Sequence, residues 1–195
     1  SASFIIAAAI LLPESHITVK NVLYNKTRLE FINVLCDMGA KIEVANIQDM
    51  GCGIKSCDIV AEYSSDIKSV NIKSNQVISM IDEIPIFCVV ASFAKGITII
   101  EDAKELRLKE CDRINAIYEN LNKMSGDIWI NGDSLKINGD KKLYNTNIKH
   151  YNDHRIAMSF EIMKLVIGER MTYKYSDIID VSFPNFYRII DSLLI

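Results

Sequence analysis

An internal repeat constrains the fold of this chain more than any other feature. The same order of segments occurs three times along the 195 residues: an apolar helix, a short strand and an amphipathic helix, followed in the first two copies by a pair of strands. Equivalent points in the first two copies, Thr18 and Thr98, lie about 80 residues apart. Because a repeat of this length indicates similar units that pack on one another, the sequence predicts an α/β (α+β) fold of about three related units.

Apolar helices begin the three units. They are expected at Ala2–Leu12, Asp82–Ala94 and Asp153–Ile167. A helix that is hydrophobic all round is usually buried. We therefore expect these three helices to lie side by side inside, in a pseudo-threefold arrangement with the sheets outside. An ordinary α+β domain whose parts resemble each other by coincidence is the alternative.

The remaining elements follow from periodicity and from turn residues. Strands are expected at His16–Val22, Lys41–Ile47, Cys57–Tyr63, Lys68–Ile72, Ile97–Ile100, Asp127–Asn131, Leu135–Asn138 and Met171–Tyr175. Amphipathic helices are expected at Asn25–Met38, Asp112–Met124 and Pro184–Leu194.

Composition narrows the class of protein. The net charge is −3 and the pI is near 5.6, which argues against nucleic-acid binding through a broad basic surface. The five cysteines form no Cys-x-x-Cys pair, which favours a reducing compartment. The apolar run Phe4–Leu12 is too short to span a bilayer. We therefore expect a cytoplasmic protein without a membrane or nucleic-acid partner.

Charged residues gather where helices are expected to begin. The stretch Arg107–Arg113 leads into one helix, and the apolar helices begin near Asp82 and Asp153. Equivalent helices in a pseudo-threefold array point the same way, so their N-termini should converge and favour anions. Cations there suit a phosphate or carboxylate, and two carboxylates beside them suit proton transfer. The candidate residues are Asp82, Lys109, Glu110, Arg113, His154 and Arg155.

Five motifs together resemble those of the 3-phosphoshikimate 1-carboxyvinyltransferase (EPSP synthase) family. They occur in order over nearly the whole chain, and 28 residues separate Asp82 from Glu110. The motifs are Asp82-Glu-Ile-Pro85, Phe93-Ala-Lys-Gly96, Arg107-Leu-Lys-Glu-Cys-Asp-Arg113, Asn152-Asp-His-Arg-Ile-Ala-Met158 and Ser182-Phe-Pro184.

The resemblance implies a two-domain enzyme with its active site between the domains. Residues 1–195 would be the C-terminal domain, without the N-terminal domain that completes the site, and would be inactive alone. The reaction implied is transfer of the enolpyruvyl group from phosphoenolpyruvate to the 5-hydroxyl of shikimate 3-phosphate, with release of phosphate. No metal or organic cofactor is implied, and the full-length enzyme is expected to be a monomer.

The resemblance also assigns roles. Asp82 would bind the 5-hydroxyl and act as general base, and Glu110 would give and take a proton at the phosphoenolpyruvate methylene. Lys109 would bind shikimate 3-phosphate, Arg113 and Arg155 would bind phosphoenolpyruvate, and His154 would support the site. Asp112 and Asp153 are expected to hold the arginines. Many family members carry a lysine where this chain has Val181, so the site is expected to have one cation fewer.

Each candidate residue also has a simpler alternative interpretation. Asp82 would be only a helix cap, Glu110 only a solvated loop charge, Arg113 and Arg155 only ion-pair partners, and His154 only a packing or capping residue. At the level of the whole protein, the alternatives are a UDP-N-acetylglucosamine enolpyruvyl transferase-like enzyme and a non-catalytic anion-binding domain of the same fold.

Overall fold

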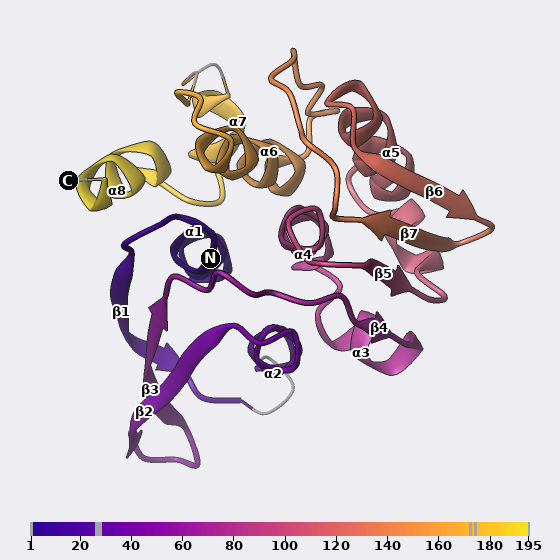
Figure 1. Ribbon diagram of the computed structural model, residues 1–195. Coiled ribbons are helices and arrows are strands. Elements are labelled where there is room, and N and C mark those ends of the chain that lie inside the picture. Colours follow the sequence, from indigo (N-terminus) through magenta and orange to yellow (C-terminus); the bar gives the residue numbers. More distant parts are fainter. Residues whose placement is uncertain (1, 26–28, 172, 174, 195) are drawn as a thin grey trace.

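Three helices form the centre of the molecule. The computed structural model describes residues 2–25, 29–171, 173 and 175–194. In it α1 (Ala2–Leu11), α4 (Ile84–Ala91) and α6 (His154–Val166) pack against one another. Figure 1 shows the three helices in the middle, with one sheet at the lower left and another at the right. The predicted arrangement of buried helices inside and sheets outside is confirmed.

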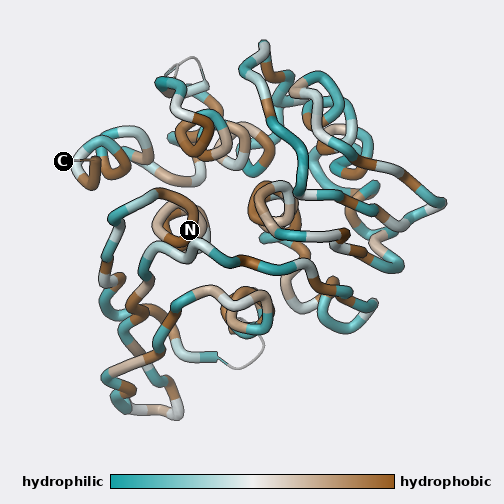
Figure 2. The backbone as a smooth tube through the Cα atoms, viewed as in Figure 1, coloured by the Kyte–Doolittle hydropathy of each residue, from teal (hydrophilic) through white to brown (hydrophobic). Residues whose placement is uncertain are grey.

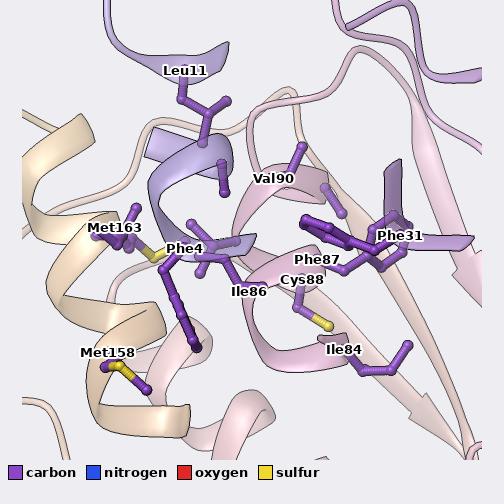
Figure 3. Packing of buried hydrophobic residues seen from close by; sticks show 14 of the residues in the cluster. Phe4, Leu11, Phe31, Ile84, Ile86, Phe87, Cys88, Val90, Met158 and Met163 are labelled. Carbon is purple, nitrogen blue, oxygen red and sulfur yellow. The ribbon is translucent and has the colours of Figure 1, made fainter. Parts of the chain in front are cut away.

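Hydrophobic side chains on all faces explain why α1 and α4 lie inside. All eight residues of α4 are buried, and α1 buries all but three of its ten residues. Figure 2 shows hydrophobic stretches along α1 and α4. In Figure 3 Phe4, Ile86 and Met163, one from each helix, lie together in the core. Burial of such side chains contributes about 1.5–3 kcal/mol each.

Two sheets cover the outside. The first has the order β1 (His16–Leu23), β3 (Lys55–Glu62), β2 (Lys41–Asp49), and all its pairs are antiparallel. The second has the order β4 (Asn71–Ile72), β5 (Ile97–Ile100), β7 (Ser134–Asn138), β6 (Asp127–Asn131). In it β4 runs parallel to β5, and the other pairs are antiparallel. Each of the first two units thus contains the predicted hairpin.

Outer helices and short segments complete the units. The amphipathic helices are α2 (Glu30–Asp37), α5 (Arg113–Lys123) and α8 (Phe186–Leu193). Phe186 of α8 packs edge-on against Phe4 of α1, with ring centroids 6.3 Å apart. The sequence did not predict α3 (Ser74–Ser79), the 3-10 helix η1 (Lys104–Leu108) or α7 (Ser176–Ile179).

Three expected elements differ from the structure. The strand expected at Met171–Tyr175 includes residues 172 and 174, which lie outside the described residues. The prediction is wrong for the described ones, because Tyr173 has φ 54°, a left-handed conformation that strands do not use. The strand at Lys68–Ile72 shortens to β4, with an isolated bridge from Lys68 to Lys95. Of the helix expected at 25–38, residues 26–28 lie outside the description.

Across the described ranges, every helix is too short or too polar to cross a bilayer.

Candidate active site

The N-termini of the three central helices meet at one cleft, as predicted. This cleft has a volume of about 460 Å³. Most of its polar lining lies at the helix starts: Ser3 near the start of α1, Asp82 and Glu83 just before α4, and Arg155 in the first turn of α6. Ser79 at the end of α3 also lines the cleft. The helix dipoles at such a place favour anions.

Asp82 lies at the centre of a ring of cations. Its Oδ1 is 3.6 Å from Nζ of Lys109 and 3.4 Å from Nη1 of Arg113, and its Oδ2 is 3.1 Å from Nη2 of Arg155. Arg155 Nη1 also donates to the backbone oxygen of Asp82, at 3.0 Å. The Asp82 side chain is 43% exposed, so a carboxylate held by three cations is still open to a ligand.

The cations keep the Asp82 carboxylate ionised. Its burial would raise the pKa, but Arg155, Lys109 and Arg113 outweigh burial and hold the pKa below its usual value. At neutral pH this group therefore accepts hydrogen bonds. The residue at the N-cap of α4 is Glu83, which makes no side-chain capping bond, so the capping role considered for Asp82 is wrong.

Arg113 joins three carboxylates and is completely buried. Its Nε donates to Asp153 at 2.7 Å and its Nη2 to Glu110 at 2.6 Å, besides the contact with Asp82. Burial would lower the pKa of Arg113, but these carboxylates raise it, with Asp153 contributing most. Arg113 therefore stays charged and serves here as an ion-pair partner. Its contact with phosphoenolpyruvate stays a prediction.

Asp153 connects two helix starts. It is completely buried, and its Oδ1 accepts from the backbone N–H groups of Arg155 and Ile156 at 2.8 and 3.2 Å, which caps α6. Its Oδ2 accepts from Arg113 at 2.7 Å and from the Cys111 thiol at 3.7 Å. One carboxylate thus fixes the start of α5 relative to the start of α6. The expectation that Asp153 holds an arginine is confirmed.

Glu110 and Lys109 bring the charged loop to this cluster. The Glu110 side chain is 45% exposed, and its Oε2 forms the 2.6 Å contact with Arg113. Glu110 is therefore more than a solvated loop charge. The Lys109 ammonium reaches Asp82 from the end of η1. All the candidate cations except His154 thus contact a carboxylate of one network.

His154 is half-buried at the start of α6. Burial, and after it the neighbouring Arg155, hold the pKa of its imidazole below the usual value, so the ring is neutral at pH 7. The two residues before Asp153, Tyr151 and Asn152, both have left-handed φ values, 55° and 58°. This tight turn precedes Asp153, His154 and Arg155, and of these three Arg155 lines the cleft.

Asp112 holds an arginine, as expected, but sequence reasoning missed the other partners of that arginine, Arg107. Its guanidinium contacts Asp112, and also Gly132 and Asp133 in the β6–β7 turn. The density of charge at 107–113 marked the loop, but sequence spacing gave no sign of a partner 26 residues away. Val181, where a lysine was expected in the family, is exposed between α7 and α8.

The arrangement offers anion binding next to proton transfer. Cationic side chains and helix N-termini suit phosphate and carboxylate groups, and two partly exposed carboxylates stand beside them. A search of the described residues for three or more grouped His, Cys, Asp or Glu side chains that could hold a metal found none.

Comparisons with known proteins show the family of the chain. The model of the EPSP synthase (3-phosphoshikimate 1-carboxyvinyltransferase) family matches residues 1–190. The 3-phosphoshikimate 1-carboxyvinyltransferase of Thermodesulfovibrio yellowstonii is 45% identical over 99% of this chain, and that of Persephonella marina is 41% identical over 100% of it. The chain spans about 45% of the length of each of these relatives.

Solved structures show the same likeness. EPSP synthase from Acinetobacter baumannii superposes with a TM-score of 0.88 at 29% identity, over 98% of this chain and 44% of that one. The enolpyruvyl transferase NikO from Streptomyces tendae has a TM-score of 0.66 at 12% identity, over 99% of this chain and 41% of its own, which shows a shared fold alone. By the match to residues 1–190, the chain belongs to the EPSP synthase (3-phosphoshikimate 1-carboxyvinyltransferase) family.

Proposed function

We propose that residues 1–195 are the C-terminal domain of a two-domain EPSP synthase. The whole enzyme would transfer the enolpyruvyl group of phosphoenolpyruvate to the 5-hydroxyl of shikimate 3-phosphate and release phosphate. Family membership supports this proposal, as does the 45% share of its relatives' length that the chain spans. The observation that carries it is the pairing of two accessible carboxylates, Asp82 and Glu110, with cations in one ion-pair network, whose members Asp82 and Arg155 line the cleft.

The two carboxylates divide the proton transfers. Asp82 accepts the proton of the 5-hydroxyl as the hydroxyl oxygen bonds to C2 of phosphoenolpyruvate. Protonated Glu110 gives a proton to the methylene carbon, which becomes a methyl group in a tetrahedral intermediate. The bond from C2 to the phosphate oxygen then breaks, the leaving phosphate takes the proton that Asp82 accepted, and Glu110 takes back a proton from the methyl group. General acid–base groups placed this way contribute about 10²–10⁴-fold each to the rate.

The substrates themselves adjust the basicity of Asp82. Lys109 and Arg155 are partly exposed, Arg155 by 23%, and they are the cations that would receive the substrate phosphate and carboxylate groups. An anion bound to them offsets the positive charge that lowers the Asp82 pKa. The pKa of Asp82 therefore rises on binding, and the carboxylate becomes a better base when the hydroxyl is in place.

The remaining candidates act around this pair. Arg113 holds Asp82 and Glu110 in place and, in the complete site, contacts phosphoenolpyruvate. Neutral His154 supports the site by hydrogen bonding. The partners of the chain are its two small-molecule substrates and its own N-terminal domain. The full enzyme works as a cytoplasmic monomer without a metal or organic cofactor.

Phosphate release by the full-length protein tests this function. It should require both phosphoenolpyruvate and shikimate 3-phosphate, and UDP-N-acetylglucosamine should not replace shikimate 3-phosphate. Asp82→Ala should lower kcat by about 10²–10⁴-fold, whereas Asp37→Ala, at an exposed aspartate at the end of α2, should leave it unchanged. Phosphate release from phosphoenolpyruvate with UDP-N-acetylglucosamine but not with shikimate 3-phosphate would reject the proposal. Full activity of Asp82→Ala would also reject it.

A further inference from the structure

The loop that carries Lys109 and Glu110 is closed by an ion pair between its ends. Nη1 of Arg107 donates to Oδ2 of Asp112 at 2.8 Å. The four residues between them are Leu108, Lys109, Glu110 and Cys111. Asp112 also caps α5, because its Oδ1 accepts from the backbone N–H of Asn115 at 3.1 Å. Arg107 therefore ties the beginning of the loop to the start of the following helix.

The same guanidinium anchors the loop to the second sheet. Nε of Arg107 donates to Oδ1 of Asp133 at 2.8 Å, and Nη2 donates to the backbone oxygen of Gly132 at 2.8 Å. All three nitrogens of the fork are thus used, toward Asp112 and the β6–β7 turn. The hydrogen bonds with Asp133 and Asp112 raise the pKa of Arg107, so it stays charged. A planar fork with fixed donors defines a position better than an ammonium group does.

Beyond these contacts and that of the half-buried Cys111 thiol with Asp153, little packing holds the tip of this loop. Leu108 is 80% exposed although it is apolar, so it adds little packing. Lys109 has an extended backbone, with φ −85° and ψ −163°. Its side chain and that of Glu110 nevertheless reach partners on other elements: Asp82 before α4, and Arg113 in α5. The position of both side chains depends on where Arg107 fixes the loop.

We infer that Arg107 is a positioning residue that places Lys109 and Glu110 in the site. The inference rests on the proposed function for its effect on the rate, since Glu110 moves the proton there. Arg107 contacts neither Asp82 nor Glu110, the proton-transfer pair. It acts on them through the closure of the loop. The contacts of Arg107 would instead be purely structural if they held only the β6–β7 turn in place.

Kinetics of the full-length enzyme give the first test. Arg107→Gln should lower kcat by about 100-fold, since a misplacement near 1 Å can cost that much. Arg107→Lys keeps the charge but not the fork and should recover part of the loss. Arg188→Gln, at an exposed arginine of α8, is the matched control and should keep the wild-type kcat. A kcat for Arg107→Gln within twofold of wild type would overturn the inference.

A double-mutant cycle separates positioning from general structural damage. In a Glu110→Gln background, Arg107→Gln should lower kcat by less than about threefold, because Glu110, the proton-transfer group through which Arg107 affects kcat, is already gone. If the loss of kcat in the double variant equals the product of the two single losses, Arg107 does not act through Glu110. If Arg107→Gln fails to fold, Asp133→Asn removes only the charge at the turn and should lower kcat by about threefold to tenfold, with the same loss of effect in the Glu110→Gln background.

Hydrogen exchange tests the inference without turnover. Amide exchange at residues 108–111, followed by mass spectrometry, should be at least about tenfold faster in Arg107→Gln than in wild type, because the loop loses its closure. Exchange at the wild-type rate would overturn the inference even if the enzyme proved to have another substrate. Faster exchange in an enzyme inactive toward shikimate 3-phosphate would reject the proposed function and support the inference.

Discussion

The first and second units have the same order of elements but differ at the start of the outer helix. In the first unit α2 begins at Glu30, and its N-cap Leu29 makes no side-chain capping bond. In the second unit α5 begins with Asp112 as a capping residue and with Arg113 fully buried among carboxylates. Both helices bury one apolar face and pack beside a hairpin.

This difference separates what the fold needs from what the site needs. The described part of the first unit forms the helix and sheet without a buried arginine, so the fold does not require one. Taking an arginine and an aspartate out of water costs several kcal/mol per ion before their pairing is counted. The second unit carries that cost at Arg113 and Asp153, beside Asp82 and Glu110. We attribute the cluster to function.

The largest effect on stability is expected from breaking the buried pair. Arg113→Met should lower the free energy of unfolding by about 3–5 kcal/mol, because Asp153 would be left charged and buried without its cation. Lys123→Met, at the exposed end of the same helix, should stay within about 0.5 kcal/mol of wild type. Urea unfolding measures both. A loss below about 1 kcal/mol for Arg113→Met would show that Arg113 does not balance Asp153.

A smaller, pH-dependent effect is expected at Asp82. Its pKa in the folded protein lies below the unfolded value of about 3.9. The stabilisation by its cations is therefore present above that value and is lost as the pH falls through the folded pKa. The difference in unfolding free energy between wild type and Asp82→Asn should shrink from pH 6 to pH 3, and Arg155→Gln should reduce the change. An equal difference at every pH would contradict this assignment.

The smallest effect is expected in the first unit. Glu30 accepts a hydrogen bond from Nε2 of Gln76 at 3.0 Å, which links α2 to α3 in a partly buried place. Gln76→Ala should change the free energy of unfolding by less than about 1 kcal/mol and leave kcat of the full-length enzyme unchanged. A loss as large as that of Arg113→Met would remove the contrast between the two units.

Much of the fold followed from the sequence because its signals were local. Helices that are apolar all round had to be inside, and β5, β6 and β7 have alternating side chains between clear turns. The strand expected near Met171 failed for a physical reason. Met171 and Tyr175 are buried and Tyr173 is exposed, so the side chains vary in burial as they do in a strand. The left-handed backbone at Tyr173 nevertheless breaks the extended conformation.

The candidate residues were predictable, and so was the pairing of Asp153 with an arginine, but most of the other contacts were not. Motif spacing and helix starts selected Asp82, Glu110 and Arg155, which the structure brings together. Spacing did not show that Arg113 would be fully buried against Asp153, because that contact depends on how α5 and α6 pack. It also gave no indication of the link from Arg107 to Asp133, which depends on the position of the β6–β7 turn.

Removing the proton-transfer group of Glu110 tests most directly the claim that this cluster is catalytic. The measurement is kcat of the full-length Glu110→Gln variant, beside Glu105→Gln at an exposed glutamate of η1. We predict that Glu110→Gln lowers kcat by about 10²–10⁴-fold while Glu105→Gln keeps the wild-type value. A Glu110→Gln enzyme within threefold of the wild-type kcat would contradict the account.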